Sequence, residues 1–93
     1  MAFVYWIRKP EHVDVFSEGY VGVTTKSVDK RFRLHCQLAF SEKDSRKSIV
    51  HKAILSYGPE ALIVETLVIA ERDYCYEVES KLRPEEMIGW NVK

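Results

Sequence analysis

Two tyrosines stand in the middle of short runs of β-branched and aromatic residues. The runs Phe3-Val4-Tyr5-Trp6-Ile7 and Gly19-Tyr20-Val21-Gly22-Val23-Thr24 are each typical of a β-strand. Because Tyr20 lies between two glycines, a neighbour or a ligand can approach the backbone of its strand closely. A phenol hydroxyl can position or activate water, although its ordinary pKa of about 10 means that it needs nearby cations to act as a base near neutral pH. We therefore expect a hairpin that presents two hydroxyl groups beside bare backbone.

An arginine and a histidine follow with the spacing of one helical face. Ser27 and Asp29 are typical of a helix N-terminus. Arg31 and His35 are four residues apart, so they point the same way. A guanidinium group can hold a phosphate at two points and stabilise its growing charge, and an imidazole can move a proton or contact a phosphate. Taken alone, Arg31 could equally be a surface cation and His35 a residue at the border of the core.

The elements that must position these side chains predict an α+β fold in a single domain over residues 1–93. After the two strands we expect helices over about residues 28–40 and 45–57, a strand over about 62–69, and a third helix over about 70–82. Gly58 and Pro59 end the second helix, and Pro84 stops the third. The first two strands are joined by a connection longer than a tight two-residue turn.

Apolar patterns inside these elements predict which faces are buried. The strand from Leu62 to Ile69 is nearly all apolar, so we expect both of its faces to be largely covered. His51 lies off the apolar stripe of the second helix, so we expect it to face solvent. The buried side of the third helix is expected to carry Tyr74, Val78 and Leu82, with Cys75 adjoining.

A net charge of zero hides a basic middle segment. Residues 26–52 carry 8 basic and 3 acidic side chains, a net charge of +5. This charge could face a polyanion such as DNA, or it could be an ordinary solvated helical face. Four side chains in the loop and the second helix are the expected contacts to a phosphate backbone: Lys43, Arg46, Lys47 and Lys52.

The composition, 46% hydrophobic and 30% charged, predicts an ordinary soluble globular chain. We expect no membrane partner, because no run approaches the roughly 18 apolar residues of a membrane span and the N-terminus does not resemble a signal peptide. Cys36 and Cys75 lack the spacing of a metal site. Buried free thiols in a reducing cytoplasm are the favoured interpretation, and a disulfide stays open.

The order of these residues resembles the GIY-YIG nuclease family, over essentially the whole chain. The residues that carry the resemblance are Tyr5, Tyr20-Val21-Gly22, Arg31, His35, Glu79 and Asn91. The tail from Glu79 to Pro84, followed by Ile88-Gly89-Trp90-Asn91, is most similar to members from phages and bacteria. Two features depart from the family: Phe3 stands where the family has its first glycine, and more residues separate the two tyrosines. Each motif alone is common, so their joint order makes the resemblance specific.

The resemblance implies a small three-stranded, mainly antiparallel sheet flanked by three helices, and metal-dependent cleavage of DNA in the cytoplasm of a bacterium or of a phage's host. Glu79 would be the single carboxylate ligand of Mg²⁺ or Mn²⁺, and Arg31 would hold the scissile phosphate. Tyr5 would activate or position the water, with Tyr20 as a second hydroxyl. His35 would move a proton or contact phosphate. Asn91 would tie the C-terminal segment to the site.

Each of these residues also has a purely structural alternative. The tyrosines could be half-buried sheet residues, Glu79 could pair with Arg83 on the helix surface, and Asn91 could make only a turn. Two other functions stay open: a catalytically silent nucleic-acid-binding module and a protein-interaction domain on the same scaffold. Because the sequence contains no separate DNA-reading domain, we expect low sequence specificity, or specificity supplied by a homodimer or another partner.

Overall fold

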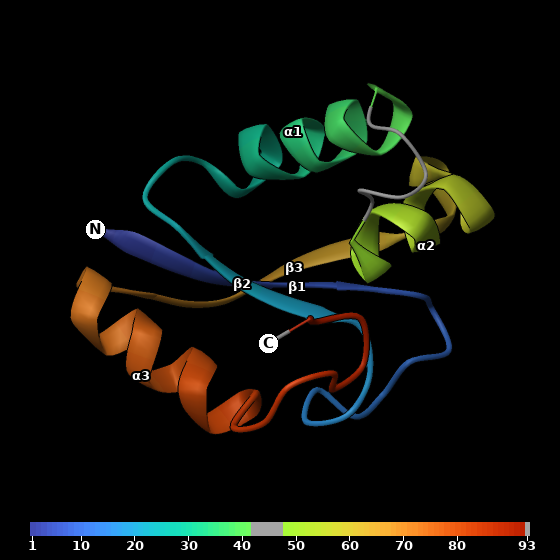
Figure 1. Ribbon diagram of the computed structural model, residues 1–93. Coiled ribbons are helices and arrows are strands. Elements are labelled where there is room, and N and C mark those ends of the chain that lie inside the picture. The colour runs from blue at the N-terminus through green and yellow to red at the C-terminus, as the bar shows by residue number, and fades with distance from the viewer. Residues whose placement is uncertain (42–47, 93) are drawn as a thin grey trace.

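The computed structural model describes residues 1–41 and 48–92 and has an α+β fold. Its elements, in chain order, are β1 (Ala2–Arg8), β2 (Tyr20–Thr24), α1 (Val28–Ser41), α2 (Ile49–Tyr57), the 3-10 helix η2 (Pro59–Ala61), β3 (Ile63–Ala70) and α3 (Arg72–Leu82) (Figure 1). The predicted fold class is confirmed, and the predicted elements agree with the observed ones to within a few residues at each end. The part of the second helix predicted over residues 45–47 lies outside the described residues.

β1 is the central strand of the sheet, which has the order β2-β1-β3 and is antiparallel throughout. Tyr5 lies opposite Gly22 of β2 and Thr66 of β3, and the register with β3 shifts between Val4 and Tyr5. Because β1 is paired along both edges and covered on both faces, most of its side chains are buried. The sheet thus holds Tyr5 at its centre.

β3 lies at the edge of the sheet, and the prediction that both of its faces are largely covered holds only in part: Val64 packs against one core and Leu67, Val68 and Ala70 against the other, but every residue keeps some exposure. None of its eight residues is fully buried, and Ile69 is 60% exposed. The apolar sequence of β3 resembles that of a central strand. However, strand order depends on long-range pairing that composition alone does not specify.

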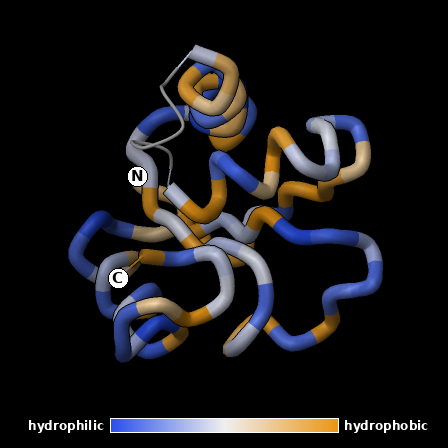
Figure 2. The backbone as a smooth tube through the Cα atoms, turned by 45° about the vertical axis from the view of Figure 1, so that its right-hand side comes forward, coloured by the Kyte–Doolittle hydropathy of each residue, from blue (hydrophilic) through white to orange (hydrophobic). Residues whose placement is uncertain are grey.

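Helices cover both faces of the sheet, α1 and α2 on one side and α3 on the other (Figure 1). The buried core under α1 and α2 comprises Tyr5, Ile7, Ala39, Val50, Ile54 and Leu62. The opposite core comprises Ala2, Val4, Trp6, Val21 and Cys75. Successive residues of β1 alternate between the two cores, as the period of a strand requires. Figure 2 shows hydrophobic residues concentrated in these inner elements and mostly hydrophilic outer loops.

The predicted ends of the first two helices follow from local chemistry. Ser27 Oγ accepts a hydrogen bond from Lys30 N at 3.2 Å, as an N-cap of α1 should. Gly58 follows α2 with φ of +84°, a conformation that favours glycine, and its N–H donates to Ile54 O at 2.9 Å. No helix in the described part of the chain has the length and apolar content needed to cross a membrane.

The buried side of α3 differs by one position from the prediction. Cys75 is fully buried against the sheet, whereas Tyr74 is 56% exposed. Val78 and Leu82 pack against the same core, as predicted. Both cysteines are free thiols, Cys75 buried and Cys36 partly exposed.

Candidate active site

Three side chains form a buried hydrogen-bond chain between β1 and the helices α1 and α2. The hydroxyl oxygen of Tyr5 lies 2.9 Å from His35 Nε2, and His35 Nδ1 lies 3.1 Å from His51 Nε2. Tyr5 is completely buried, and His35 and His51 are 3% and 7% exposed. One consistent arrangement has the Tyr5 hydroxyl donating to His35 Nε2 while His35 Nδ1–H donates to His51.

A cleft of about 320 Å³ opens beside this chain, next to the edge strand β2. Its lining comes from β2, all three α-helices and the C-terminal segment: Tyr20, Arg31, His35, Leu38, Ser48, Val50, His51, Glu79, Trp90, Asn91 and Val92. The predicted catalytic residues other than Tyr5 all belong to this lining. Tyr5 lies behind the cleft and reaches it through its hydrogen bond to His35.

Gly22 makes room for the two tyrosine rings. A Cβ atom at this position would lie 2.6 Å from the Tyr5 hydroxyl oxygen and 2.8 Å from Tyr20 Cε2. The ring centroids of Tyr5 and Tyr20 are 6.1 Å apart, and the Tyr20 ring meets the His35 ring edge-on at 5.2 Å. The expected close approach to bare backbone in β2 is therefore present, with the tyrosines themselves as the approaching groups.

Both tyrosines keep their protons near neutral pH. Burial raises the pKa of Tyr5 above its ordinary value of 10, and the Arg31 guanidinium only partly opposes this rise. Burial also raises the pKa of Tyr20; Tyr5 and Arg31 oppose that rise, while the Glu79 charge adds to it. Burial therefore outweighs the cation that was expected to lower the pKa of the phenols. Neither tyrosine is a preformed tyrosinate base.

His35, in the middle of this hydrogen-bond chain, is a neutral imidazole and a weak base. Burial, followed by the charges of Arg31 and His51, lowers its pKa from 6.5 to about 4. The imidazole is therefore neutral near pH 7. Its Nε2 atom already lies within hydrogen-bond distance of Tyr5.

Glu79 is the one acidic side chain among the residues that line the cleft. It projects from the α3 side, and its charge reaches Tyr20, whose pKa it helps to raise. Among residues 1–41 and 48–92, no three His, Cys, Asp or Glu side chains gather as a metal-binding group. Mg²⁺ is commonly held by one or two carboxylates together with waters and substrate phosphates. A single carboxylate that faces an open cleft fits that mode of binding.

Asn91 ties the C-terminal segment to β2. Its Oδ1 accepts a hydrogen bond from Val21 N at 2.9 Å, and its Nδ2 donates to Val21 O at 2.9 Å. Next to it, Trp90 N donates to Gly19 O at 2.8 Å, and the Trp90 ring stacks on Tyr57 of α2. Asn91 thus closes one side of the cleft by pairing with the strand that carries Tyr20.

Arg83 holds this junction together, a role that the sequence did not indicate. It is 5% exposed, and its Nε donates to Asn91 Oδ1 at 3.0 Å. Its other nitrogens donate to backbone carbonyls, those of Val15, Glu18, Gly19 and Leu82. The arginine therefore fastens the long β1–β2 connection to the end of α3 and to the C-terminal segment. Burial lowers the pKa of Arg83.

His51 was expected to face solvent, but it is buried. A broader apolar stripe on α2 would have included it, since His51 precedes the core residue Ile54 by three positions. Of the four predicted DNA contacts, Lys43, Arg46 and Lys47 lie outside the described residues. Lys52 is exposed on α2 beside Tyr57 and Trp90.

No protein-family model, curated protein or solved structure gives a significant match to this chain. The resemblance to the GIY-YIG nucleases therefore depends on the residues quoted above and on the geometry in which they meet.

Proposed function

We propose that this protein is a metal-dependent endonuclease that hydrolyses DNA phosphodiester bonds. One observation carries the proposal. Five of the side chains that the GIY-YIG resemblance names, drawn from separate parts of the chain, line a single cleft: Tyr20, Arg31, His35, Glu79 and Asn91. The sixth, Tyr5, is hydrogen-bonded to one of them. An arginine, a carboxylate, a neutral imidazole and a phenol are groups that can supply the charge stabilisation and proton transfer of phosphodiester hydrolysis.

In this proposal Arg31 binds the scissile phosphate. It projects from α1 into the cleft, partly buried, and can grip two phosphoryl oxygens with its planar guanidinium. Burial in the cleft wall strengthens its stabilisation of the charge that grows on those oxygens.

Water activation is assigned to the tyrosines and His35 together. Tyr20 lines the cleft and orients the water, and Tyr5 lies behind it, buried and protonated. The relay passes one proton at each step: the water gives a proton to the Tyr20 hydroxyl oxygen, Tyr20 gives its own proton to the Tyr5 oxygen, and Tyr5 gives its own to His35 Nε2, 2.9 Å away. Both tyrosines end neutral, so no free tyrosinate forms, and the low pKa of His35, about 4, means that the imidazole gives the proton up again readily.

Glu79 would hold a divalent cation, Mg²⁺ or Mn²⁺. When bound, such an ion supplies charge stabilisation for the phosphoryl oxygens and the leaving 3′ oxygen. Glu79 provides a hard oxygen ligand in the lining of the same cleft as Arg31.

The test is incubation of the purified protein with supercoiled plasmid DNA in Mg²⁺, in Mn²⁺ and in EDTA. Conversion to nicked or linear DNA with either ion, and none in EDTA, is the expected result. Intact plasmid under all three conditions, with a folded protein that still binds DNA, would reject the enzyme. That outcome would favour the alternative of a silent DNA-binding module, which the complete burial of Tyr5 also fits.

A further inference from the structure

A second hollow adjoins the cleft along the β2 edge. It has a volume of about 540 Å³ and is lined by the end of β2, by α1 and by α3: Val23, Thr24, Thr25, Lys26, Lys30, Arg31, Leu34, Arg72 and Tyr76. We call it the cationic groove. Arg31 belongs to the lining of both the groove and the cleft, so the two hollows meet at this side chain.

The helices on either side carry residues of both hollows at helical spacing. On α3, Arg72, Tyr76 and Glu79 are separated by four and three residues, so they lie along one face. On α1, Arg31, Leu34 and Leu38 follow the same rule. The groove and the cleft are therefore consecutive parts of one trough between α1 and α3, with β2 as its floor.

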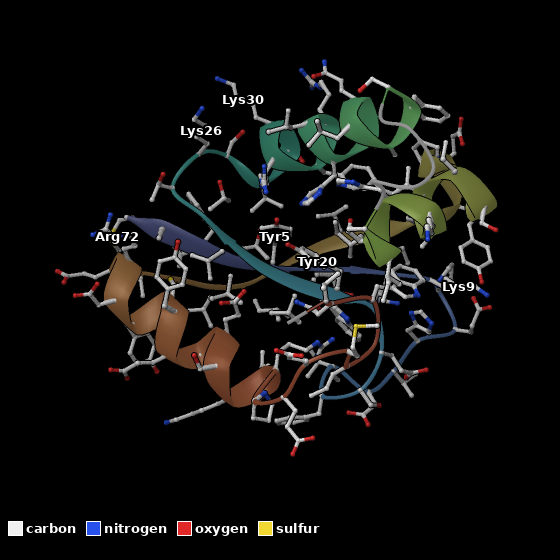
Figure 3. The ribbon with its side chains drawn as sticks, in the orientation of Figure 1. Tyr5, Lys9, Tyr20, Lys26, Lys30 and Arg72 are labelled. Atoms are coloured by element: carbon white, nitrogen blue, oxygen red, sulfur yellow. The ribbon has the colours of Figure 1, made fainter. Side chains whose placement is uncertain are left out.

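The groove carries charge of a single sign. Its lining contains four basic side chains, Lys26, Lys30, Arg31 and Arg72, and no acidic one. Figure 3 shows Lys26, Lys30 and Arg72 gathered on one side of the molecule, with Tyr5 and Tyr20 further in along the sheet. The ion pairs found among the described residues involve Arg8 and Lys9 and none of these three cations. The ring of Tyr76, 49% exposed, offers an apolar surface beside them.

We propose that the cationic groove binds the phosphates next to the scissile phosphate on the same DNA strand. The inference rests on the proposed function, because the cleft fixes where the scissile phosphate lies. The seven helical steps from Arg72 to Glu79 span about 10 Å, which corresponds to about three nucleotides along one strand of duplex DNA. The groove, and not only the predicted contacts of the basic segment before residue 53, is then a main contact to the DNA backbone.

The experiment compares two double variants of the full chain with equal charge loss. Lys30→Gln/Arg72→Gln removes one groove cation from α1 and one from α3. Arg33→Gln/Lys81→Gln removes one exposed cation from each of the same helices, outside the groove. The affinity for a short duplex oligonucleotide is measured in EDTA from about 50 to 200 mM salt, the range over which counterion release dominates binding.

The groove variant should show a salt slope smaller in magnitude by about 2, since each lost phosphate contact removes about 0.9. Across this fourfold range of salt, the factor by which its DNA affinity falls should then be about ten times smaller than the factor for the wild type. The control variant should keep the wild-type slope. Equal slopes in wild type and groove variant, or equal losses in both variants, would overturn the inference.

This measurement separates the groove from the proposed chemistry. If the salt slope depends on the groove cations but the wild-type protein never cleaves DNA, the proposed DNA-binding groove stands and the proposed nuclease activity is rejected. If the wild-type protein cleaves plasmid but the groove variant keeps the wild-type salt slope, the proposed nuclease activity stands and the proposed DNA-binding groove is rejected.

Discussion

The hydroxyl oxygen of Tyr5 and the Nε2 atom of His35 lie 2.9 Å apart, and neither residue exposes more than 3% of its surface. The hydrogen bond joins the central strand to α1 across 30 residues of sequence. Burial raises the pKa of the phenol and lowers that of the imidazole. Both groups are therefore neutral near pH 7, and the pair can pass a proton without first holding a charge in the interior.

Tyr5→Phe tests this pair. The substitution removes one hydroxyl and keeps the ring, so the sheet should remain folded. If the hydroxyl relays the water proton to His35, single-turnover cleavage should fall by about 10²–10⁴-fold. Raising the pH should recover little of the loss, because the group is absent and not merely protonated. Tyr74→Phe, on the exposed side of α3, is the matched control. A well-folded Tyr5→Phe protein that cleaves at the wild-type rate would remove Tyr5 from the mechanism.

The low pKa of His35 predicts how stability depends on pH. His35 titrates near 4 when folded and near 6.5 when unfolded. Between these values the unfolded chain binds more protons, so stability falls as the pH drops below about 6.5 and levels off below about 4. At pH 5 the loss relative to pH 7 should be about 2 kcal/mol.

Urea unfolding at pH 7 and at pH 5 measures this loss. His35→Gln does not titrate, so its stability should fall by about 2 kcal/mol less than that of the wild type over the same interval. Gln37→Ala, on the exposed face of α1, removes no titratable group, so as the control it should keep the wild-type dependence. Identical pH dependence in wild type and His35→Gln would show that His35 is not buried in its neutral form.

Local sequence patterns were sufficient to predict the helices and strands and most of the cleft. β-branched and aromatic content predicted β1 and β2, and the spacing of Arg31 and His35 on α1 brings both to the same cleft. Asn91 ties the C-terminal segment to β2 through two hydrogen bonds to Val21. These features depend on residues that are close in sequence, or on a motif whose order is fixed.

Features that depend on distant backbone atoms could not be predicted in the same way. Arg83 is buried because it donates to carbonyls of the β1–β2 connection, 64 to 68 residues away. Every residue carries such a carbonyl, so no side-chain pattern marks the partners. The edge position of β3 and the complete burial of Tyr5 likewise follow from strand order, which is a long-range property.

Glu79→Gln tests the carboxylate in the cleft. The amide keeps the size of the side chain and removes the charge that a divalent cation requires. Plasmid cleavage in Mg²⁺ should be abolished, while DNA affinity in EDTA should change little. Glu77→Gln removes an exposed charge from the same helix and should cleave normally. Mg²⁺-dependent cleavage by Glu79→Gln at the wild-type rate would exclude Glu79 as the ligand.

Gly22→Ala tests whether the spacing of the two tyrosines matters. The added Cβ would lie 2.6 Å from the Tyr5 hydroxyl oxygen, 2.7 Å from Tyr5 Cζ and 2.8 Å from Tyr20 Cε2, so at least one ring must move. Overpacking of this kind should lower the free energy of unfolding by about 1–3 kcal/mol. Cleavage by the folded fraction should fall as well, because movement of Tyr5 lengthens its hydrogen bond to His35.

Thr66→Ala is the control for Gly22→Ala, since Thr66 pairs with Tyr5 from the opposite strand and its side chain is exposed. It should lower stability by less than about 1 kcal/mol and leave cleavage unchanged. Urea unfolding gives the stability of each variant, and single-turnover assays well below each melting temperature give the rate. If Gly22→Ala matches the wild type in both measurements, the rings can shift without cost, and the glycine serves neither packing nor the proton relay.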